Sequence, residues 1–470
     1  MIPRIKIGIV GTGYVGIVTG CCLASLGFSV WCMDAESAKV DMLNNGQLPI
    51  YEPELEDIFI AERQSGRLRF VHTLPELLDV DVIFITVGTL EQDSQGGRTG
   101  ALGCHNVSAI VTQLFSHGFT GICVIKSTVA IGFTENIYDS LGHSLRETHR
   151  EQGEHNKNSK DFDRGFSILL NPEFLRQGQA IHDFMNPDRV VIGSIDGVEN
   201  SDVRILRDTI YAPILQDKIA CLITDFKSAE MIKIASNAFL AVKLSFINEI
   251  SSLCEALGGD IRHVAHGIGL DARIGLQHFS PGPGYGGSCL PKDTESLVSS
   301  AERAGSPITI AAAARDANDK VKRNVIQKIQ KCCGEQVAGK SIALCGIGFK
   351  SETDDVRNSI ALFIMHHFCR EGATFVIFDK VIQNCPELQD ILQGISLKWA
   401  ETLDEVMQAV DLLVLINACI DVDTEGICYH APMMRQRIVL DLRNSLCRDT
   451  LKRAGIQYYG IGTAVDNRFS

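Results

Sequence analysis

Three glycines after the first strand-like run restrict the fold more than any other feature of this sequence. The run Lys6–Val10 is short and apolar, and the glycines follow it directly, ahead of a helical pattern. Only glycine allows the tight turn, the close approach to a pyrophosphate and the close helix–strand contact that a dinucleotide site needs. The amino end of the helix then faces the phosphates with its partial positive charge. The residues of this predicted nucleotide loop are Gly11, Thr12, Gly13, Tyr14, Val15 and Gly16.

An acid at the end of the second strand-like run indicates which coenzyme the loop binds. The run Ser29–Met33 is followed by Asp34, which lies 34 − 16 = 18 residues after Gly16, close to the usual spacing of about 20. A carboxylate at this position accepts a hydrogen bond from a ribose 2′-hydroxyl and repels a 2′-phosphate, so NAD is favoured over NADP. A glycine-rich turn without a ligand remains the alternative.

Strand-like runs alternate with helical patterns through the first part of the chain, which is typical of a parallel sheet with helices on both faces. A charged stretch, His143–Arg164, interrupts the pattern, and we interpret it as a solvated insertion without a catalytic role. The expected strands are Lys6–Val10, Ser29–Met33, Val82–Val87, Gly121–Ile125 and Ser167–Leu170.

A long segment from about Asp225 to Ala256 lacks Pro and Gly and repeats apolar residues at helical spacing. It predicts a helix of roughly 45 Å, which would bridge domains or build a subunit interface. Strand-like runs resume after Gly339. We therefore expect an α/β fold of two Rossmann-like doubly wound domains joined by a long central helix, with boundaries at residues 1–215, 216–325 and 326–470. The later strands are expected at Ser341–Cys345, Thr374–Phe378, Leu412–Ile416 and Ile438–Leu440.

Charge and composition exclude several classes of function. The chain of 470 residues has 44 Lys and Arg against 57 Asp and Glu, a formal charge of −13, which argues against general binding to nucleic acid or anionic membranes. It has no apolar run long enough to span a membrane, and its beginning does not resemble a signal peptide. Its 16 cysteines include no C-x-x-C pair, so we expect reduced thiols in a cytoplasmic protein and no metal site.

One cysteine lies in an unusual setting. Cys289 ends the glycine-rich stretch 281–288, and Pro291 suits the first turn of a following helix. A thiol at a helix amino end beside Lys292 should have a lowered pKa, and Asp293 is an acid within reach of the same turn. Spacing alone leaves two interpretations equally open, a nucleophile and a structural loop cysteine.

Two polar side chains of the predicted long helix fall on one face. Lys233 and Asn237 are four residues apart, and a cation with an amide donor suits the stabilisation of a developing oxyanion. A solvated helix face is the alternative.

In the second α/β domain, Lys350 follows the turn Gly346-Ile347-Gly348. A lysine there favours a different phosphate-bearing ligand, which the lysine would hold as a point charge. A surface lysine is the alternative.

Together these motifs resemble the UDP-glucose/GDP-mannose dehydrogenase family over nearly the whole chain. The motifs that carry the resemblance, besides the nucleotide loop, Lys233 and Asn237, are Ile50-Tyr51-Glu52-Pro53, Lys126-Ser127-Thr128-Val129, Asn171-Pro172-Glu173-Phe174-Leu175, Gly286-Gly287-Ser288-Cys289-Leu290-Pro291-Lys292-Asp293, Phe349-Lys350 and Asp354-Asp355-Val356-Arg357. The resemblance implies a four-electron oxidation in which two NAD molecules successively convert a sugar C6 alcohol to a carboxylate. It implies UDP-glucose as the substrate, with GDP-mannose as the alternative, and a homodimer.

The resemblance also implies residue roles. Cys289 matches the nucleophile, whose thiolate adds to an aldehyde so that a second hydride can leave. Lys233 and Asn237 match oxyanion donors, Glu173 the water-activating acid, and Thr128 and Asp293 the proton-relay and support positions. Arg273 matches an arginine that reaches the neighbouring subunit. The implied substrate contacts are Glu173, Phe174, Leu175, Lys233, Asn237, Arg273, Tyr285, Gly286, Phe349, Lys350 and Arg443. Besides the loop and Asp34, the implied cofactor contacts are Lys39, Thr89, Thr128, Gln177 and Arg357.

The sequence departs from the family pattern at three places. Ala130 and Leu90 stand where many members have proline; the proline at the position of Ala130 shapes a turn, so a difference in loop stiffness is expected there. Gln177 stands where many members have glutamate; it keeps hydrogen-bonding capacity but loses charge, so a difference in cofactor affinity is expected. Ser288 and Lys292 favour the UDP-glucose and GDP-mannose branches over the N-acetylamino-sugar branches.

Two further hypotheses remain for the function of the chain. One is a nucleotide-sugar-binding regulator without catalysis, and the other is a two-electron hydroxy-acid dehydrogenase with a similar bridging helix.

Overall fold

The computed structural model describes residues 5–92, 98–151, 165–215, 219–382, 388, 391–419 and 421–463, without the side chains of 90–101 and 143–151. These residues form two compact units, Met1–Ser236 and Asn237–Ser470. The division falls inside helix α8 (Phe226–Leu257), the helix expected near residues 225–256. One continuous helix therefore contributes Lys233 to the first unit and Asn237 to the second.

The first unit is built on an eight-stranded sheet with the order β10-β9-β8-β7-β4-β1-β2-β3. The strands from β3 to β8 are parallel and, without the hairpin β5–β6, follow the order of a doubly wound dinucleotide-binding fold. At the other edge β9 runs antiparallel to β8, which differs from the all-parallel expectation. The strands are β1 Lys6–Val10, β2 Ser29–Met33, β3 Leu68–Val71, β4 Val82–Ile85, β5 Leu90–Gln92, β6 Arg98–Leu102, β7 Ile122–Ile125, β8 Ser167–Leu170, β9 Arg189–Ser194 and β10 Ala220–Asp225.

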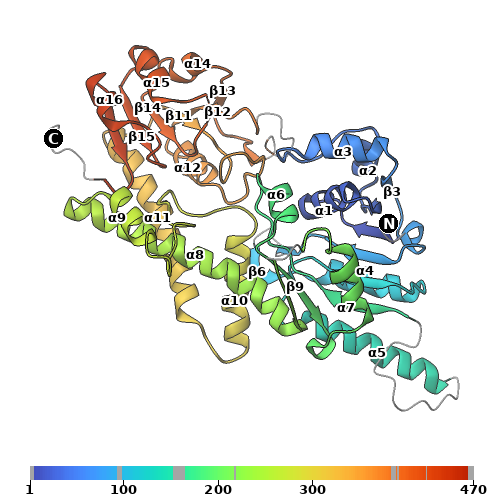
Figure 1. Cartoon of the computed structure of the whole chain (residues 1–470). Helices are drawn as coiled ribbons and strands as arrows, with labels where there is room; N and C mark the ends of the chain where they lie inside the picture. Colours follow the sequence, from blue (N-terminus) through green and yellow to red (C-terminus); the bar gives the residue numbers. More distant parts are fainter. Residues whose placement is uncertain are drawn as a thin grey trace. The chain divides into compact units, whose positions relative to one another are not determined.

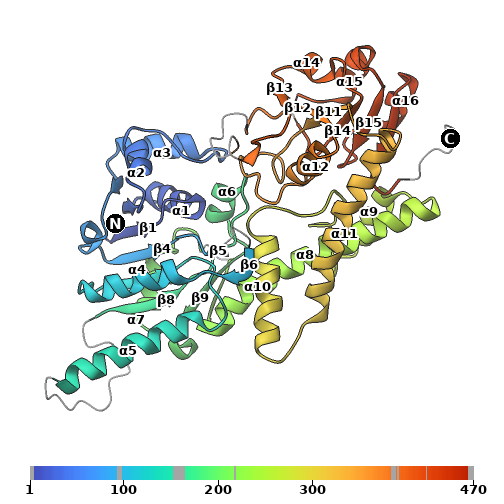
Figure 2. The ribbon, with the colours of Figure 1, turned by 180° about the vertical axis from the view of Figure 1, so that it is seen from behind.

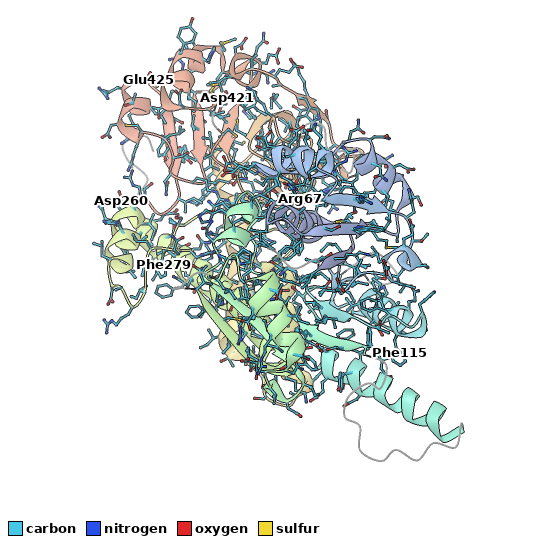
Figure 3. All side chains as sticks on the ribbon, turned by 45° about the vertical axis from the view of Figure 1, so that its right-hand side comes forward. Arg67, Phe115, Asp260, Phe279, Asp421 and Glu425 are labelled. Carbon is cyan, nitrogen blue, oxygen red and sulfur yellow. The ribbon has the colours of Figure 1, made fainter. Side chains whose placement is uncertain are left out.

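Helices cover both faces of this sheet, with α1, α2 and α3 on one side and α4 and α5 on the other (Figures 1 and 2). Helix α1 is buried along most of its length. On the other face Phe115 of α4, labelled in Figure 3, packs edge-on against Phe166 at 5.6 Å between ring centroids. The helices are α1 Tyr14–Ser25, α2 Ser37–Asn44, α3 Leu55–Gln64, α4 His105–Ser116, α5 Phe133–Glu151, α6 Ala180–Met185 and α7 Ser201–Ile205, with short helical segments η1 Leu74–Leu77, η2 Ile195–Gly197 and η3 Leu206–Ile210.

The second unit contains a six-stranded sheet in which all strands are parallel, with the order β13-β12-β11-β14-β15-β16. Separate buried clusters lie on its two faces, one against α12 and one against α14, α15 and α16. The strands are β11 Ser341–Cys345, β12 Thr374–Phe378, β13 Leu397–Trp399, β14 Leu412–Leu415, β15 Ile438–Asp441 and β16 Gln457–Gly460. The helices are α9 Ile261–Gly269, α10 Leu290–Arg303, α11 Thr309–Cys332, α12 Ile360–Cys369, α14 Leu403–Met407, α15 Thr424–His430, α16 Arg448–Arg453 and the short η4 Ala431–Met433.

The expected fold class, two Rossmann-like doubly wound domains with a long central helix, is confirmed. The central strands fall where the apolar runs indicated. The unexpected strands β3, β9, β10, β13 and β16 lie at or next to a sheet edge. Strand β10 is only partly buried, whereas β9 is a short buried apolar run that the sequence analysis overlooked. Part of the charged stretch 143–164 belongs to α5, and residues 152–164 lie outside the described ones. Among the described residues, no helix has both the length and the apolar character of a membrane span.

Candidate active site

The nucleotide loop lies where the strand order reverses in the first sheet, because β1 pairs with β2 on one side and with β4 on the other. Ligands of doubly wound sheets bind at this point, outside the carboxyl ends of the strands. Gly11 has a φ of +98°, and a Cβ at Gly16 would lie 1.8 Å from the Gly11 carbonyl oxygen. A Cβ at Gly13 would meet nothing within 4 Å. The loop thus has the tight turn, the close packing and the open backbone that the pyrophosphate of NAD requires.

Asp34 is fixed at the edge of this loop by hydrogen bonds. Its Oδ2 accepts from both the backbone N–H and the hydroxyl of Thr12, each at 2.7 Å, and Lys39 Nζ lies 3.4 Å away. Burial opposes ionisation, but the hydrogen bonds from Thr12 outweigh it and hold the pKa of Asp34 below its ordinary value. The carboxylate is therefore ionised, as a partner for a ribose hydroxyl must be.

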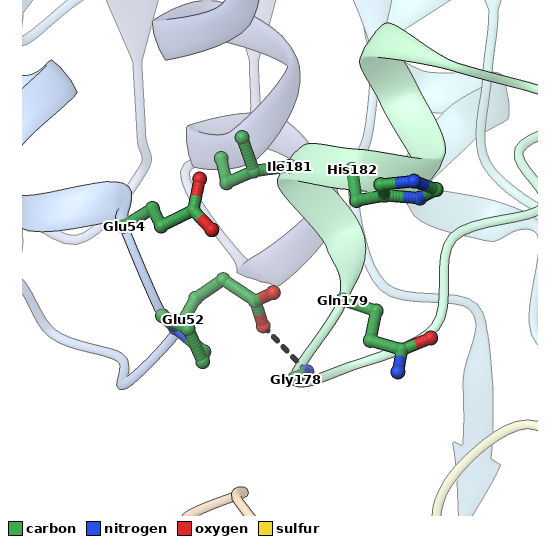
Figure 4. A pocket seen from close by; sticks show the side chains of 7 residues that line it. Glu52, Glu54, Gly178, Gln179, Ile181 and His182 are labelled. Carbon is green, nitrogen blue, oxygen red and sulfur yellow. Dashed lines mark hydrogen bonds between the residues drawn. The ribbon is translucent and has the colours of Figure 1, made fainter.

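Glu52 connects the nucleotide loop to the segment that carries Gln177, a contact that the sequence analysis missed. The buried Glu52 carboxylate accepts the N–H groups of Gly178 and Ala180, each at 2.6 Å, and the hydroxyl of Tyr14 (Figure 4). The pocket in Figure 4 opens beside this contact and is lined in part by His182. Two implied cofactor positions therefore lie near the Glu52 carboxylate. Tyr14 donates to it directly, and Gln177 precedes Gly178, whose N–H donates to it.

Thr89 and Thr128 are brought together by a hydrogen bond from the Thr89 hydroxyl to the Thr128 carbonyl oxygen at 2.7 Å. The Ser127 hydroxyl donates to the carbonyl of Val87 at the same distance. The loops that follow β4 and β7 are therefore hydrogen-bonded to each other at the carboxyl ends of the strands, beside the point between β1 and β4 where the strand order reverses.

Glu173 and Lys233 form a buried ion pair. Lys233 Nζ lies 2.9 Å from Glu173 Oε1, and both side chains are almost inaccessible to solvent. Burial raises the pKa of Glu173, but Lys233 and the Leu175 N–H, which donates to Oε2 at 2.7 Å, bring it below the ordinary value. The Phe174 ring lies beside the same cation, 5.4 Å from Lys233 Nζ. These four residues, predicted from motifs far apart in the sequence, share one place in the first unit.

In the second unit Cys289 occupies the cap position at the amino end of helix α10, and its side chain is exposed. Lys292 Nζ lies 3.0 Å from Asp293 Oδ1, so this lysine is paired with the buried acid of its own turn. Asp293 also accepts a hydrogen bond from the Asn237 amide at 2.6 Å. The predicted relay acid and the predicted oxyanion donor are therefore in direct contact.

The glycine loop before Cys289 is packed tightly against Phe349, a predicted substrate contact, and against two asparagines. Gly287 has a φ of +78°, and a Cβ there would lie 2.8 Å from the Phe349 ring. A Cβ at Gly286 would lie 2.4 Å from the Asn358 carbonyl oxygen. Tyr285 is held at both its N–H and its carbonyl by the Asn318 side chain, at 2.8 and 3.1 Å. The loop needs glycine because backbone and ring approach it from both sides.

Gly287→Ala should destabilise the protein by about 3 kcal/mol, the sum of a left-handed backbone penalty and overpacking against Phe349. Gly334→Ala is the matched control, because its φ is +73° but a Cβ there meets nothing within 4 Å; it should cost only about 1 kcal/mol. Urea unfolding of both variants checks this. Equal losses would show that contact with Phe349 contributes nothing.

The second sheet also reverses its strand order between two neighbours, here β11 and β14, and several polar residues gather at that point. Asn417 donates to the carbonyls of Gly346 and Gly348 at 3.0 and 2.6 Å and accepts from Arg443 at 2.8 Å. Burial lowers the pKa of Arg443 to about 10, which still leaves the guanidinium charged at neutral pH. Lys350 Nζ lies 5.8 Å from the centroid of the Phe349 ring. This point of the second sheet thus combines a glycine turn with two cationic side chains, Lys350 and Arg443. Asn417 connects Arg443 to the turn, and the sequence analysis missed it.

Two predicted arginines pair with acids of their own loops. Arg273 is strongly exposed and pairs with Asp271 at 2.6 Å. Arg357 pairs with Asp355 at 2.6 Å, while its carbonyl accepts the Gly287 N–H at 2.8 Å. Arg357 thus contacts the glycine loop through its backbone, whereas the side chain of Arg273 hydrogen-bonds to Asp271 of its own turn.

Comparison with protein families decides the membership of the chain. Residues 5–215 match the NAD binding domain, 227–320 the central domain and 343–448 the UDP binding domain of the UDP-glucose/GDP-mannose dehydrogenase family. The chain belongs to this family. The resemblance inferred from the motifs is confirmed, and so is NAD as the cofactor.

Individual relatives agree along the full length. A UDP-glucose 6-dehydrogenase of Rhizobium meliloti is 34% identical over 97% of this chain and 99% of its own. One of Bacillus subtilis is 35% identical over 97% of this chain and 93% of its own. The structure is similar to that of a UDP-glucose dehydrogenase from the archaeon Pyrobaculum islandicum, with a TM-score of 0.82, 29% identity and coverage of 99% and 100%. The chain is an NAD-dependent dehydrogenase of this family. Among the described residues, no cluster of three or more His, Cys, Asp or Glu could hold a metal ion.

Proposed function

We propose that the protein oxidises the C6 alcohol of UDP-glucose to the carboxylate of UDP-glucuronate. The observation that carries the proposal is the exposed Cys289 at the amino end of α10, one turn from a buried Asp293 that binds Asn237. Bound NAD would accept the hydride removed in each oxidation. The reaction balances as R–CH₂OH + 2 NAD⁺ + H₂O → R–COO⁻ + 2 NADH + 3 H⁺.

In the first oxidation the alcohol oxygen gains negative charge as its proton leaves. Lys233 and Asn237, one turn apart on α8, are the donors that we assign to this oxygen, and each such donor is worth about 3–4 kcal/mol in known enzymes. Thr128 and Asp293 are assigned to relay the proton. The buried Glu173 keeps Lys233 charged in a site of low polarity.

In the second oxidation Cys289 acts as the nucleophile. Its thiolate forms a C–S bond to the aldehyde carbon, and the resulting tetrahedral carbon again bears a hydrogen that can leave as hydride. Loss of that hydride converts the adduct to a thioester. Glu173 then takes a proton from water as the water oxygen bonds to the carbonyl carbon and the C–S bond breaks. The ionised state of Glu173 suits a proton acceptor.

The uridine diphosphate is assigned to the second sheet, where Lys350 and the buried Arg443 lie at the strand order reversal. The support comes from the match of residues 343–448 to the UDP binding domain and from the cationic character of the two side chains. Asn417 holds Arg443 against the glycine turn. Arg273, Tyr285 and Phe349 remain proposed substrate contacts, and Lys39, Thr89, Gln177 and Arg357 proposed cofactor contacts.

A substrate screen with counting of NADH tests the proposal. The purified protein is given NAD with UDP-glucose, GDP-mannose or a UDP-N-acetylamino sugar, and NADH is measured per nucleotide sugar consumed. Two NADH per UDP-glucose is the expected result. Turnover of GDP-mannose alone would reject the substrate, and one NADH per sugar would reject the four-electron reaction.

We further propose a homodimer in which α8 lies in the interface. Phe239, Phe246 and Leu253 repeat at intervals of seven along α8 and are 63, 47 and 51% exposed, a stripe that a soluble monomer would leave in contact with water. Phe246 also contacts Phe279, labelled in Figure 3, at 6.5 Å between centroids. Sedimentation should give twice the mass of one chain, and Phe246→Glu should halve it. A monomeric wild type would refute the dimer.

A further inference from the structure

A buried lysine that the motif analysis left without a role lies behind the Glu173–Lys233 pair. Lys126 directly follows strand β7, and its side chain is almost fully buried. Its ammonium donates to Asn171 Oδ1 at 3.0 Å and to the Tyr211 hydroxyl at 3.2 Å. The Tyr211 hydroxyl also donates to Asn171 Oδ1, at 2.5 Å. Three side chains thus form a closed buried group.

Both hydrogen-bond partners of Lys126 are neutral, which is unusual for a buried ammonium. Removing such a cation from water is costly unless a carboxylate compensates it directly. The acid in electrostatic range is Glu173, and this carboxylate already contacts Lys233. A purely structural lysine would be better replaced by an apolar side chain of the same length, because the apolar side chain would need no compensation.

The backbone around Asn171 explains how Lys126 can act on Glu173. The Asn171 N–H donates to the Ile125 carbonyl at 2.8 Å, and its side-chain amide donates to the Val191 carbonyl at 2.9 Å. Asn171 is therefore fixed between β7 and β9, two residues before Glu173. Lys126 and Tyr211 both donate to the side-chain oxygen of Asn171, so the segment that presents Glu173 is anchored to a cation.

We propose that Lys126 is a positioning residue of the reaction, a second buried cation that keeps Glu173 ionised and its segment in place. This inference rests on the proposed function. Lys126, Lys233 and Glu173 carry two positive charges and one negative charge, so the group as a whole keeps one net positive charge. That surplus favours the build-up of negative charge on a substrate oxygen beside Lys233. Burial lowers the pKa of Lys126 to about 8, which leaves it charged at neutral pH.

The test is the pH dependence of NADH formation by Lys126→Met, from about pH 4 to about pH 7. The charged or titratable groups around Lys126 are Glu173 on the segment after β8, Lys233 on α8 and Tyr211 after η3. Without the Lys126 charge, the acid limb should move up by about 1 pH unit, because Glu173 has lost one of two nearby cations. Lys126→Arg, which keeps the charge, should keep the wild-type limb.

Tyr211→Phe is the matched control, because it removes a hydrogen bond of the same group without removing charge. Its rate should fall at all pH values while the acid limb stays in place. If Lys126→Met does not fold, Lys126→Gln takes the place of the Met variant in the same assay, because the glutamine side chain keeps hydrogen-bonding capacity. A lower rate for Lys126→Met at every pH with an unmoved limb would overturn the proposal, since only packing would then have been lost.

A readout without substrate separates this inference from the proposed function. The lowered pKa of Glu173 means that its ionised form stabilises the fold above the ordinary pKa of a glutamate, and this stability is lost as the pH falls through the lowered value. Lys126→Met should lose it at a higher pH than the wild type in urea unfolding from about pH 6 to about pH 3. Coincident curves would refute the role of Lys126 even in an active enzyme. An inactive wild type with separated curves would refute only the function.

Discussion

Cys289→Ser is expected to lower two-NADH turnover of UDP-glucose at least about 10³-fold, the largest effect of any single change in this protein. A serine hydroxyl is a far weaker nucleophile at neutral pH than a thiolate. The aldehyde formed by the first oxidation then has no partner that turns it into a hydride donor. NADH formed in single-turnover and steady-state assays measures the loss.

Cys447→Ser is the matched control for this variant. Cys447 is also exposed and also caps a helix, α16, and hydrogen bonding with Thr450 lowers its pKa. The variant thus removes an exposed thiol whose pKa is lowered and leaves the glycine loop before Cys289 unchanged. Its turnover should stay at the wild-type level. Two NADH per sugar at an undiminished rate from Cys289→Ser would disprove the nucleophile.

Glu173→Gln is expected to trap the thioester on Cys289 and to slow turnover by about 10²–10⁴-fold, the usual range for a general base. The amide cannot accept a proton from water, so the reaction stops after both oxidations. A rapid formation of two NADH per active site should precede a slow steady state. Mass spectrometry of the acid-quenched protein should then find the nucleotide-sugar acyl group on the peptide that contains Cys289.

Glu62→Gln controls for the removal of a buried carboxylate from the same unit. Glu62 is buried and pairs with Arg67, labelled in Figure 3, at 2.6 Å. This variant should lose stability through a broken ion pair but should accumulate no acyl adduct. If Glu173→Gln slowed the first oxidation as much as the last, Glu173 would serve to hold Lys233 rather than to activate water.

The parts of the fold that could be predicted depend on short stretches of backbone. The turn at Gly11 needs a positive φ, and the close contact at Gly16 leaves no room for a side chain. Central strands such as β1 and β11 are buried, so their residues are almost all apolar. The edge strands β10 and β16, which were missed, are only partly buried, and a partly buried strand need not show the long apolar run of a strand covered on both faces.

The family motifs supplied the named candidate residues of the site but not the residues that support them. Glu173, Lys233, Asn237 and Cys289 come from family motifs, and the structure adds which of them are in contact. Glu52 and Lys126 stand inside recognised motifs, yet nothing local showed their function. Their partners Gly178 and Tyr211 are 126 and 85 positions away. A charged residue at the end of a buried strand, as Lys126 is, was the one signal that could have directed attention to it.

The sequence by itself determined that this chain forms two doubly wound sheets, because their turns and buried strands follow from local backbone geometry. The thiol, the acid and the amide proposed for the oxidation were singled out by the family motifs, since spacing alone left other interpretations open. Only the tertiary structure decided that Glu173 meets Lys233 in a buried pair, that Lys292 is paired with Asp293, and that Lys126 lies behind the pair with neutral partners. The charge state of each group depends on burial and on neighbours distant in the sequence, and these exist only once the chain has folded.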